Sequence, residues 1–135
     1  MAGIGYADSR YSVEKVLICP LEADLTSAAD VGTFDFSENI TITELGIIIS
    51  TTVAADTTAP VVAIKEGTTE LATLTVADGS AAKDVVKTTT ITKANNINSG
   101  DTLTFNVKTA ANDSGTAAGK GYIYIKYKER FYQAA

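Results

Sequence analysis

The stretch DTLTFNVK (residues 101–108) decides the fold class, because its apolar and polar residues alternate without interruption. Leu103, Phe105 and Val107 fall on one face of an extended chain, and the intervening Thr, Asn and Lys residues fall on the other. Such a period of two predicts a β-strand with one buried face and one hydrated face. We therefore expect Leu103, Phe105 and Val107 to lie in a hydrophobic core.

The rest of the chain repeats this pattern. Short runs rich in β-branched residues are separated by clusters of Gly, Asn, Asp and Ser, and the 135 residues are enough for one domain. We predict a single all-β domain, an antiparallel β-sandwich, for which eight strands suit a jelly roll. One segment, residues 19–32, could form a short helix or an irregular loop. The expected strands are 13–19, 32–36, 40–52, 61–65, 70–76, 85–93, 102–109 and 121–128.

The strand predicted at residues 40–52 changes its apolar parity. In ITITELGIII the first two apolar residues, Ile40 and Ile42, are even-numbered, whereas Leu45, Ile47 and Ile49 are odd-numbered. Such a switch requires a bulge or bend near residues 43–46. Because Ile48 makes the following segment apolar on both faces, we expect its outer face to be covered by a loop or by another subunit.

Residues 1–12 are expected to form an extended arm ahead of the β-sandwich of residues 13–135. The arm contains Tyr6, Arg10 and Tyr11, which are residue types favoured at interfaces. A frayed terminus without a role is the alternative. The first residues lack the basic and apolar regions of a secretory signal, and no apolar run approaches the length of a membrane span. We therefore expect that the protein is made in a cytoplasm and either stays there or leaves it by some means other than its own signal peptide, and that it has no membrane partner.

Charge and histidine content exclude several classes of function. The net charge is −5: the segment from Lys120 carries four basic residues and one acid, and the preceding part carries seven basic residues and fifteen acids. An acidic body of this kind disfavours nucleic acid as a partner. The chain has no histidine, which excludes Ser-His-Asp and Cys-His nucleophile systems and the usual zinc sites. We expect no enzyme activity and no cofactor.

Three weaker possibilities concern individual polar residues. Cys19 is the only cysteine, and we expect a reduced, buried thiol. A pair of carboxylates could in principle hydrolyse glycosides, although the chain has no Trp to bind a sugar ring. Acidic residues in loops could bind calcium, but turn formation explains them better, since no calcium-binding spacing is present. These loop acids are Asp56, Asp78, Asp84, Asp101 and Asp113.

The final strand, GYIYIKYK (residues 121–128), has two distinct faces. Ile123, Ile125 and Tyr127 are expected to face the core. The opposite face carries tyrosine and lysine, which favours either an interface with an acidic partner or the hydrated outer face of a sheet. The residues expected at an interface with a partner protein or another subunit are Tyr6, Arg10, Tyr11, Ile48, Tyr122, Tyr124, Lys126 and Lys128.

Four segments in sequence order carry a resemblance to a known family. TELGIIISTTV, EGTTELATLTV, NINSGDTLTFNVKT and GYIYIKY together resemble the small jelly-roll head decoration, or cement, proteins of tailed bacteriophages, over residues 33–127. The resemblance implies a homotrimer on the outer surface of a virion, bound to the major capsid protein and without catalysis. INSGDTLTF also resembles receptor-binding and carbohydrate-binding jelly rolls, so a module of a phage tail fibre is the alternative.

Overall fold

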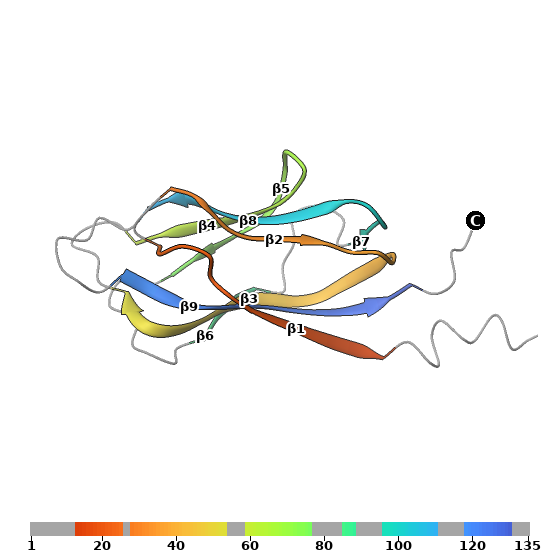
Figure 1. The fold of residues 1–135 in the computed structure, drawn as a ribbon, viewed down its shortest axis with the longest axis horizontal. Helices are drawn as coiled ribbons and strands as arrows, with labels where there is room; N and C mark the ends of the chain where they lie inside the picture. The colour runs from red at the N-terminus through yellow and green to blue at the C-terminus, as the bar shows by residue number, and fades with distance from the viewer. Residues whose placement is uncertain are drawn as a thin grey trace, which may run out of the picture.

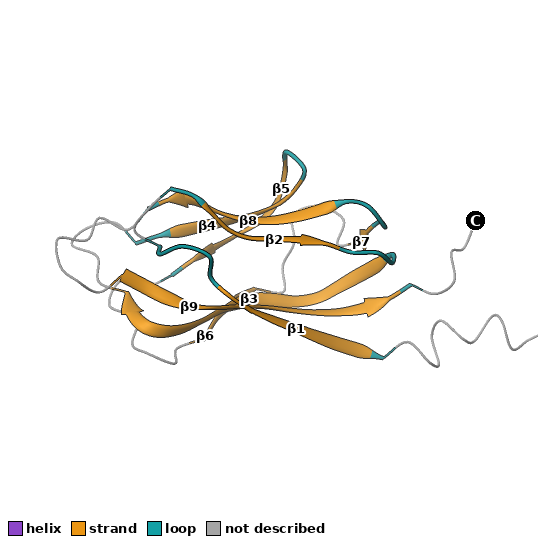
Figure 2. Ribbon diagram, viewed as in Figure 1, coloured by secondary structure: helices purple, strands orange, loops and turns teal. Residues whose placement is uncertain are grey.

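A computed structural model shows two β-sheets packed face to face (Figures 1 and 2). It describes residues 13–25, 28–53, 59–76, 85–88, 96–110 and 118–130, with the backbone alone at 52, 53, 85–88 and 118. These residues form strands, turns and loops, with no helix among them. The predicted all-β antiparallel sandwich is confirmed.

The strand order is that of a jelly roll. Sheet A contains, in spatial order, β1 (Glu14–Pro20), β9 (Ala118–Glu129), β3 (Ile40–Val53) and β6 (Val85–Thr88), and β7 (Asn96–Ile97) pairs with the start of β3. Sheet B contains β2 (Asp30–Asp35), β8 (Thr102–Thr109), β4 (Val61–Glu66) and β5 (Thr69–Thr75). The chain passes between the sheets six times along these strands, and every pairing is antiparallel.

All eight predicted strands are present, with ends that differ by a few residues. The two-residue strand β7 was not predicted, because a bridge so short leaves no periodicity. The predicted strand at 85–93 is seen as β6, and residues 89–93 lie outside the described part. No helix forms in the described residues of the segment 19–32, where Leu21 to Leu25 make a loop after β1.

The bend predicted in the long strand is a bulge at Thr43. Ile42 pairs with Tyr127 and Glu44 pairs with Lys126, so Thr43 is an extra residue on β3. The bulge resets the alternation of side chains. Ile40 and Ile42 before it, and the odd-numbered apolar residues after it, therefore all point into the core.

The core lies between the two sheets, and Phe105 is among its largest fully buried side chains. Its ring meets that of Phe34 edge to face, with centroids 5.9 Å apart. Ile123 and Ile125 are buried as predicted, and half-buried Tyr127 packs against Phe36 at 5.4 Å between centroids. The predicted core positions of β8 are confirmed: Leu103, Phe105 and Val107 are at most 1 % exposed.

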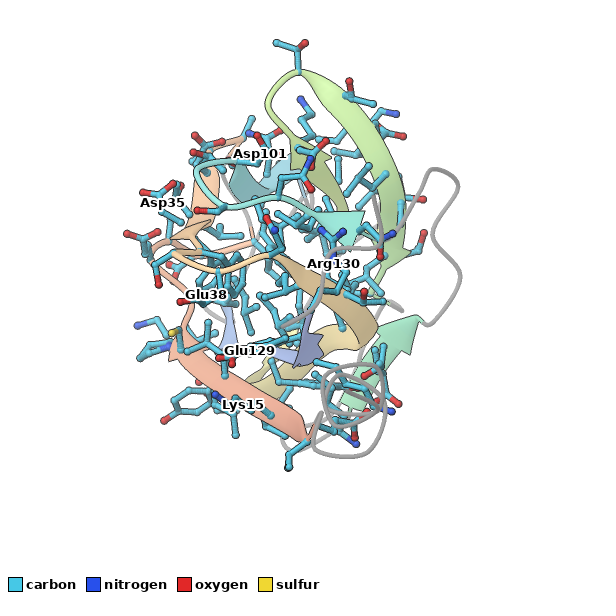
Figure 3. The ribbon with its side chains drawn as sticks, turned by 90° about the vertical axis from the view of Figure 1, so that its right-hand side faces the viewer. Lys15, Asp35, Glu38, Asp101, Glu129 and Arg130 are labelled. Atoms are coloured by element: carbon cyan, nitrogen blue, oxygen red, sulfur yellow. The ribbon has the colours of Figure 1, made fainter. Side chains whose placement is uncertain are left out.

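Arg130 lies at one end of the sandwich, where β3, β7 and β9 meet, and forms hydrogen bonds there (Figure 3). Its backbone N–H donates to the carbonyl of Asn39 at 2.7 Å. Its guanidinium donates to the carbonyl oxygens of Ile40 at 3.2 Å and Ile97 at 3.1 Å, and to Asn98 Oδ1 at 3.0 Å. A planar group with several donors thus satisfies backbone carbonyls from two strands and fixes the end of β9.

Cys19 differs from its expected environment. The thiol was predicted to be buried, but it is half-buried, because β1 is an edge strand and its inward side chains are only partly covered by sheet B.

None of the described residues forms a helix that is long and apolar enough to cross a membrane.

Candidate interaction surface

The outer face of sheet A is the side turned away from sheet B, downward in Figure 1. Side chains alternate along each strand, so residues that are paired across neighbouring strands share this face. Ile18 of β1, Tyr124 of β9 and Gly46 of β3 lie side by side in one row, and Pro20, Tyr122 and Ile48 form the next row. We use "the outer face" for the residues Val16, Ile18, Pro20, Glu44, Gly46, Ile48, Tyr122, Tyr124, Lys126 and Lys128.

Large apolar side chains are exposed on this face. Val16 is 53 % exposed, Ile18 56 % and Tyr122 42 %, and the half-buried Ile48 is paired with Tyr122. The remaining large hydrophobic side chain that is exposed among the described residues, Val13, directly precedes β1. Single exposed apolar residues are normal on protein surfaces, but a continuous patch indicates a site of interaction.

Tyr124 lies in the middle of the outer face and is only 6 % exposed. The residue opposite it on β3 is Gly46, which has no side chain and so leaves room for the ring. The Tyr124 hydroxyl donates a 2.7 Å hydrogen bond to Glu44 Oε2. Burial, reinforced by this hydrogen bond to a carboxylate, raises the pKa of Tyr124 above its ordinary value.

The lysines of the outer face have acidic neighbours in the same sheet. Lys126, which is half-buried, pairs with Glu44, and the exposed Lys128 pairs with Glu14. Opposite charges in neighbouring strands stabilise a sheet modestly. Because this part of the face is nearly neutral, its distinctive property is its apolar area rather than the basic charge expected from the sequence.

The outer face of sheet B provides a contrast, because it is built from polar pairs. Asn106 donates to Asp30 at 2.7 Å, Thr102 donates to Asp35 at 2.6 Å, and Lys108 forms an ion pair with Glu70 at 3.1 Å. Among the described residues of this sheet, no large hydrophobic side chain is exposed. The two faces of the sandwich therefore differ in kind, and that of sheet A is the one suited to contact.

The opening between edge strands β1 and β2 holds two shallow hollows. One, of about 320 Å³, is lined by Cys19, Gly32 and Phe34 among others, and the second, of about 260 Å³, by Leu17 and Phe36. Polar side chains also line both hollows: Glu22 and Thr33 line the first, and Asp35, Ser37, Glu38 and Glu129 line the second. Within the described residues, no group of three or more Cys, Asp or Glu side chains could hold a metal ion.

Two carboxyl groups do lie close together on sheet B. Burial and the neighbouring Asp101 raise the pKa of Glu66, the last residue of β4. Asp101 also accepts the N–H of Asn98 at 3.3 Å, as a turn residue does. Asp56, Asp78, Asp84 and Asp113, the other acids considered for calcium, lie outside the described residues.

Five of the eight residues predicted at an interface share one face: Ile48, Tyr122, Tyr124, Lys126 and Lys128. The others, Tyr6, Arg10 and Tyr11, lie outside the described residues. Sequence reasoning missed Val16 and Ile18. Their signal is present in EKVLICP, where four consecutive apolar residues on a strand require that both of its faces be apolar.

Comparisons with known proteins found one distant structural neighbour. No family model and no curated protein matches this chain. A solved structure described by the words "Bacillus endospore appendages form a novel family of disulfide-linked pili" is similar with a TM-score of 0.47 and 18 % sequence identity, over 89 % of this chain and 88 % of that one. At this level of similarity, the likeness carries no information about function.

Proposed function

We propose that this protein is a structural subunit that attaches to a larger protein assembly through the outer face of sheet A. The assembly that the sequence resemblance suggests is the head of a tailed bacteriophage, on whose outer surface the protein would act as a decoration, or cement, protein. Its partner would then be the major capsid protein, and it would perform no catalysis.

The observation that supports this proposal is the concentration of exposed large apolar side chains on one face: of the four such side chains among the described residues, Val16, Ile18 and Tyr122 lie on it. Full burial of a side chain such as Val or Ile contributes roughly 1.5 to 3 kcal/mol. Val16, Ile18 and Tyr122 each keep about half of their surface in water, so a docked partner would gain from covering them. Tyrosine at the centre of an interface also loses little conformational entropy on binding.

Self-association would strengthen such an attachment. A homo-oligomer, which the resemblance implies to be a trimer, presents several copies of the outer face to a repeating lattice. Once one copy is bound, the others bind at a high effective concentration, so modest individual contacts give firm attachment. The tyrosine-bearing arm of residues 1–12 would add a second contact to each copy.

The proposal is tested by sedimenting the purified protein with expanded, empty phage capsids and, separately, with host cells. We expect the wild-type protein to pellet with capsids, and Tyr122→Lys to weaken attachment by at least tenfold, about 1.4 kcal/mol. Thr73→Lys is the matched control, since it introduces the same charge at an exposed strand position of sheet B. Equal attachment of the two variants would contradict the proposed surface, and pelleting with host cells alone would indicate a tail-fibre module.

A further inference from the structure

The free edge of β1 is the second unusual feature of sheet A. Among the described strands, β1 has a neighbour on one side alone, β9. Leu21 N–H donates to Gly121 O at 2.9 Å, which places the odd-numbered residues of this segment in hydrogen-bonded pairs with β9. The backbone groups of the even-numbered residues, Val16 and Ile18, therefore point toward the free edge.

Charged side chains usually protect such an edge from pairing, but those of β1 are turned toward its own sheet. Lys15 Nζ forms a 2.6 Å ion pair with Glu129 Oε1 on β9 (Figure 3). Glu14 Oε2 accepts a 2.6 Å hydrogen bond from Thr43 on β3, on the far side of β9. Within the described part of the chain, the edge thus presents backbone groups without a strand partner beside two exposed apolar side chains, Val16 and Ile18.

Proline limits the usable edge at one end. Pro20 has no N–H, and its backbone nitrogen lies on the same side of the strand as those of Val16 and Ile18. An added strand can therefore exchange complete pairs of hydrogen bonds with Val16 and Ile18, but not with Pro20. The available segment is short, which favours a partner whose own edge matches it residue for residue.

We propose that the β1 edge binds the β1 edge of a second copy of this chain, in an antiparallel pair whose two-fold axis passes beside Leu17. In this register Val16 of each copy lies opposite Ile18 of the partner subunit. Both residues have outward-pointing backbone groups, so the two pairs exchange four hydrogen bonds. The result is a single continuous sheet across the two copies.

The side chains that would face each other favour the axis beside Leu17 over an axis beside Val16. With the axis beside Leu17, Val16 and Ile18 from both copies form one apolar cluster on the outer face, and Lys15 lies opposite Cys19 of the partner subunit. With the axis beside Val16, Glu14 would lie opposite Ile18 of the partner subunit, an acid against an apolar side chain. Neither charged residue of β1 faces a like charge in the proposed register, so self-pairing meets no direct repulsion.

A second copy is the occupant that these features favour. An isologous contact requires a surface complementary to itself, and β1 meets this requirement because its two outer apolar residues, Val16 and Ile18, face each other across the proposed axis. The pairing would deepen the proposed function, because paired copies could join neighbouring attachment sites of a lattice. Its test uses the purified chain alone, so its failure is distinguishable from failure of capsid attachment.

The test introduces one thiol opposite the natural one. In a non-hydrogen-bonded antiparallel pair the Cα atoms are about 4.5 Å apart, within the range for a disulfide. Lys15→Cys should therefore form two intermolecular disulfides with Cys19 of the partner subunit under mild oxidation. An intramolecular bond is impossible, because four residues of a strand separate positions 15 and 19 by roughly 13 Å. Non-reducing electrophoresis and peptide mass spectrometry identify the product.

Three comparisons decide the outcome. The wild-type protein, with Cys19 alone, controls for random collision, and Val13→Cys probes the register centred on Val16. Adding Ile18→Lys to Lys15→Cys should slow disulfide formation at least tenfold, whereas adding Thr73→Lys should not. Faster cross-linking of Val13→Cys than of Lys15→Cys would overturn the proposed register. Cross-linking of neither above the wild-type rate would overturn self-pairing through β1.

Discussion

The Tyr124 hydroxyl and the Glu44 carboxylate are joined by a 2.7 Å hydrogen bond at the centre of the outer face of sheet A. Glu44 is the first residue after the Thr43 bulge, and Tyr124 lies opposite Gly46, two residues further along β3. The bond therefore links β9 to the part of β3 where the alternation of side chains is reset. Tyr124 itself is only 6 % exposed, whereas its neighbours Ile18 and Tyr122 are exposed.

Tyr124→Phe should reduce the free energy of unfolding by about 1.5 to 3 kcal/mol at neutral pH, because it removes a hydrogen bond to a charged acceptor but keeps the ring. The change should be measured by denaturant unfolding. Glu44→Gln, which retains an acceptor for the hydroxyl, should cost less. A loss of capsid attachment without any loss of stability in Tyr124→Phe would assign the hydroxyl to binding instead.

Tyr124 should also make the protein less stable in alkali. Its pKa is raised in the folded state, so above an ordinary tyrosine pKa of about 10 the unfolded chain releases this proton while the folded chain retains it. Stability contributed by Tyr124 is therefore complete below pH 10 and declines as the pH rises further. The free energy of unfolding, measured from pH 9 to 11, should decline less steeply in Tyr124→Phe than in the wild type. Parallel curves for the two proteins would contradict this role of Tyr124.

Phe105→Ala should destabilise the domain by about 3 to 5 kcal/mol, because it removes a fully buried ring and its edge-to-face contact with Phe34. The melting temperature should fall before any specific effect on attachment is seen. Phe105→Leu, which fills more of the space, should cost less. If Phe105→Ala kept its melting temperature and lost only capsid association, the assignment of the Phe105 side of β8 to the core would be wrong.

Gly121→Ala should destabilise the pairing of β3 and β9, because a Cβ atom at Gly121 would overlap the carbonyl oxygen of Ile48. Backbone cannot move aside as a flexible side chain can, so we expect a loss of about 1 to 3 kcal/mol, measured by thermal unfolding. Gly67→Asn is the control. Gly67 has a φ of 59° with open space around it, and Asn tolerates this conformation. Equal losses in both variants would contradict the steric explanation.

Deletion of residues 2–12 should leave the melting temperature nearly unchanged and weaken capsid attachment at least tenfold, about 1.4 kcal/mol. The reason is that an arm without apolar periodicity adds little to its own domain but offers Tyr6, Arg10 and Tyr11 to a partner. Substituting these three residues together in the full-length chain provides the matched comparison. If attachment is unchanged by the deletion, the arm has no role and the binding surface is confined to the outer face.

The sequence was sufficient to predict the sandwich, the core positions of β8 and the bulge in β3, because each leaves a local trace in the alternation of apolar residues. The environment of Tyr124 could not be predicted in this way. Its burial depends on Gly46, which is distant in sequence and lies opposite it only after the register of β3 and β9 is set. The exposure of Val16 and Ile18 likewise depends on β1 being an edge strand, which is a property of the topology.

The proposed attachment of the outer face to a capsid is tested most directly by quantitative mass spectrometry of purified virions that carry substitutions in this gene. With the wild-type chain, we predict a fixed copy number relative to the major capsid protein. Virions carrying Tyr122→Lys should lose most of these copies, and those carrying Thr73→Lys should keep them, with both variant proteins equally stable when purified. Full occupancy in Tyr122→Lys virions, or absence of the wild-type chain from virions, would contradict the account.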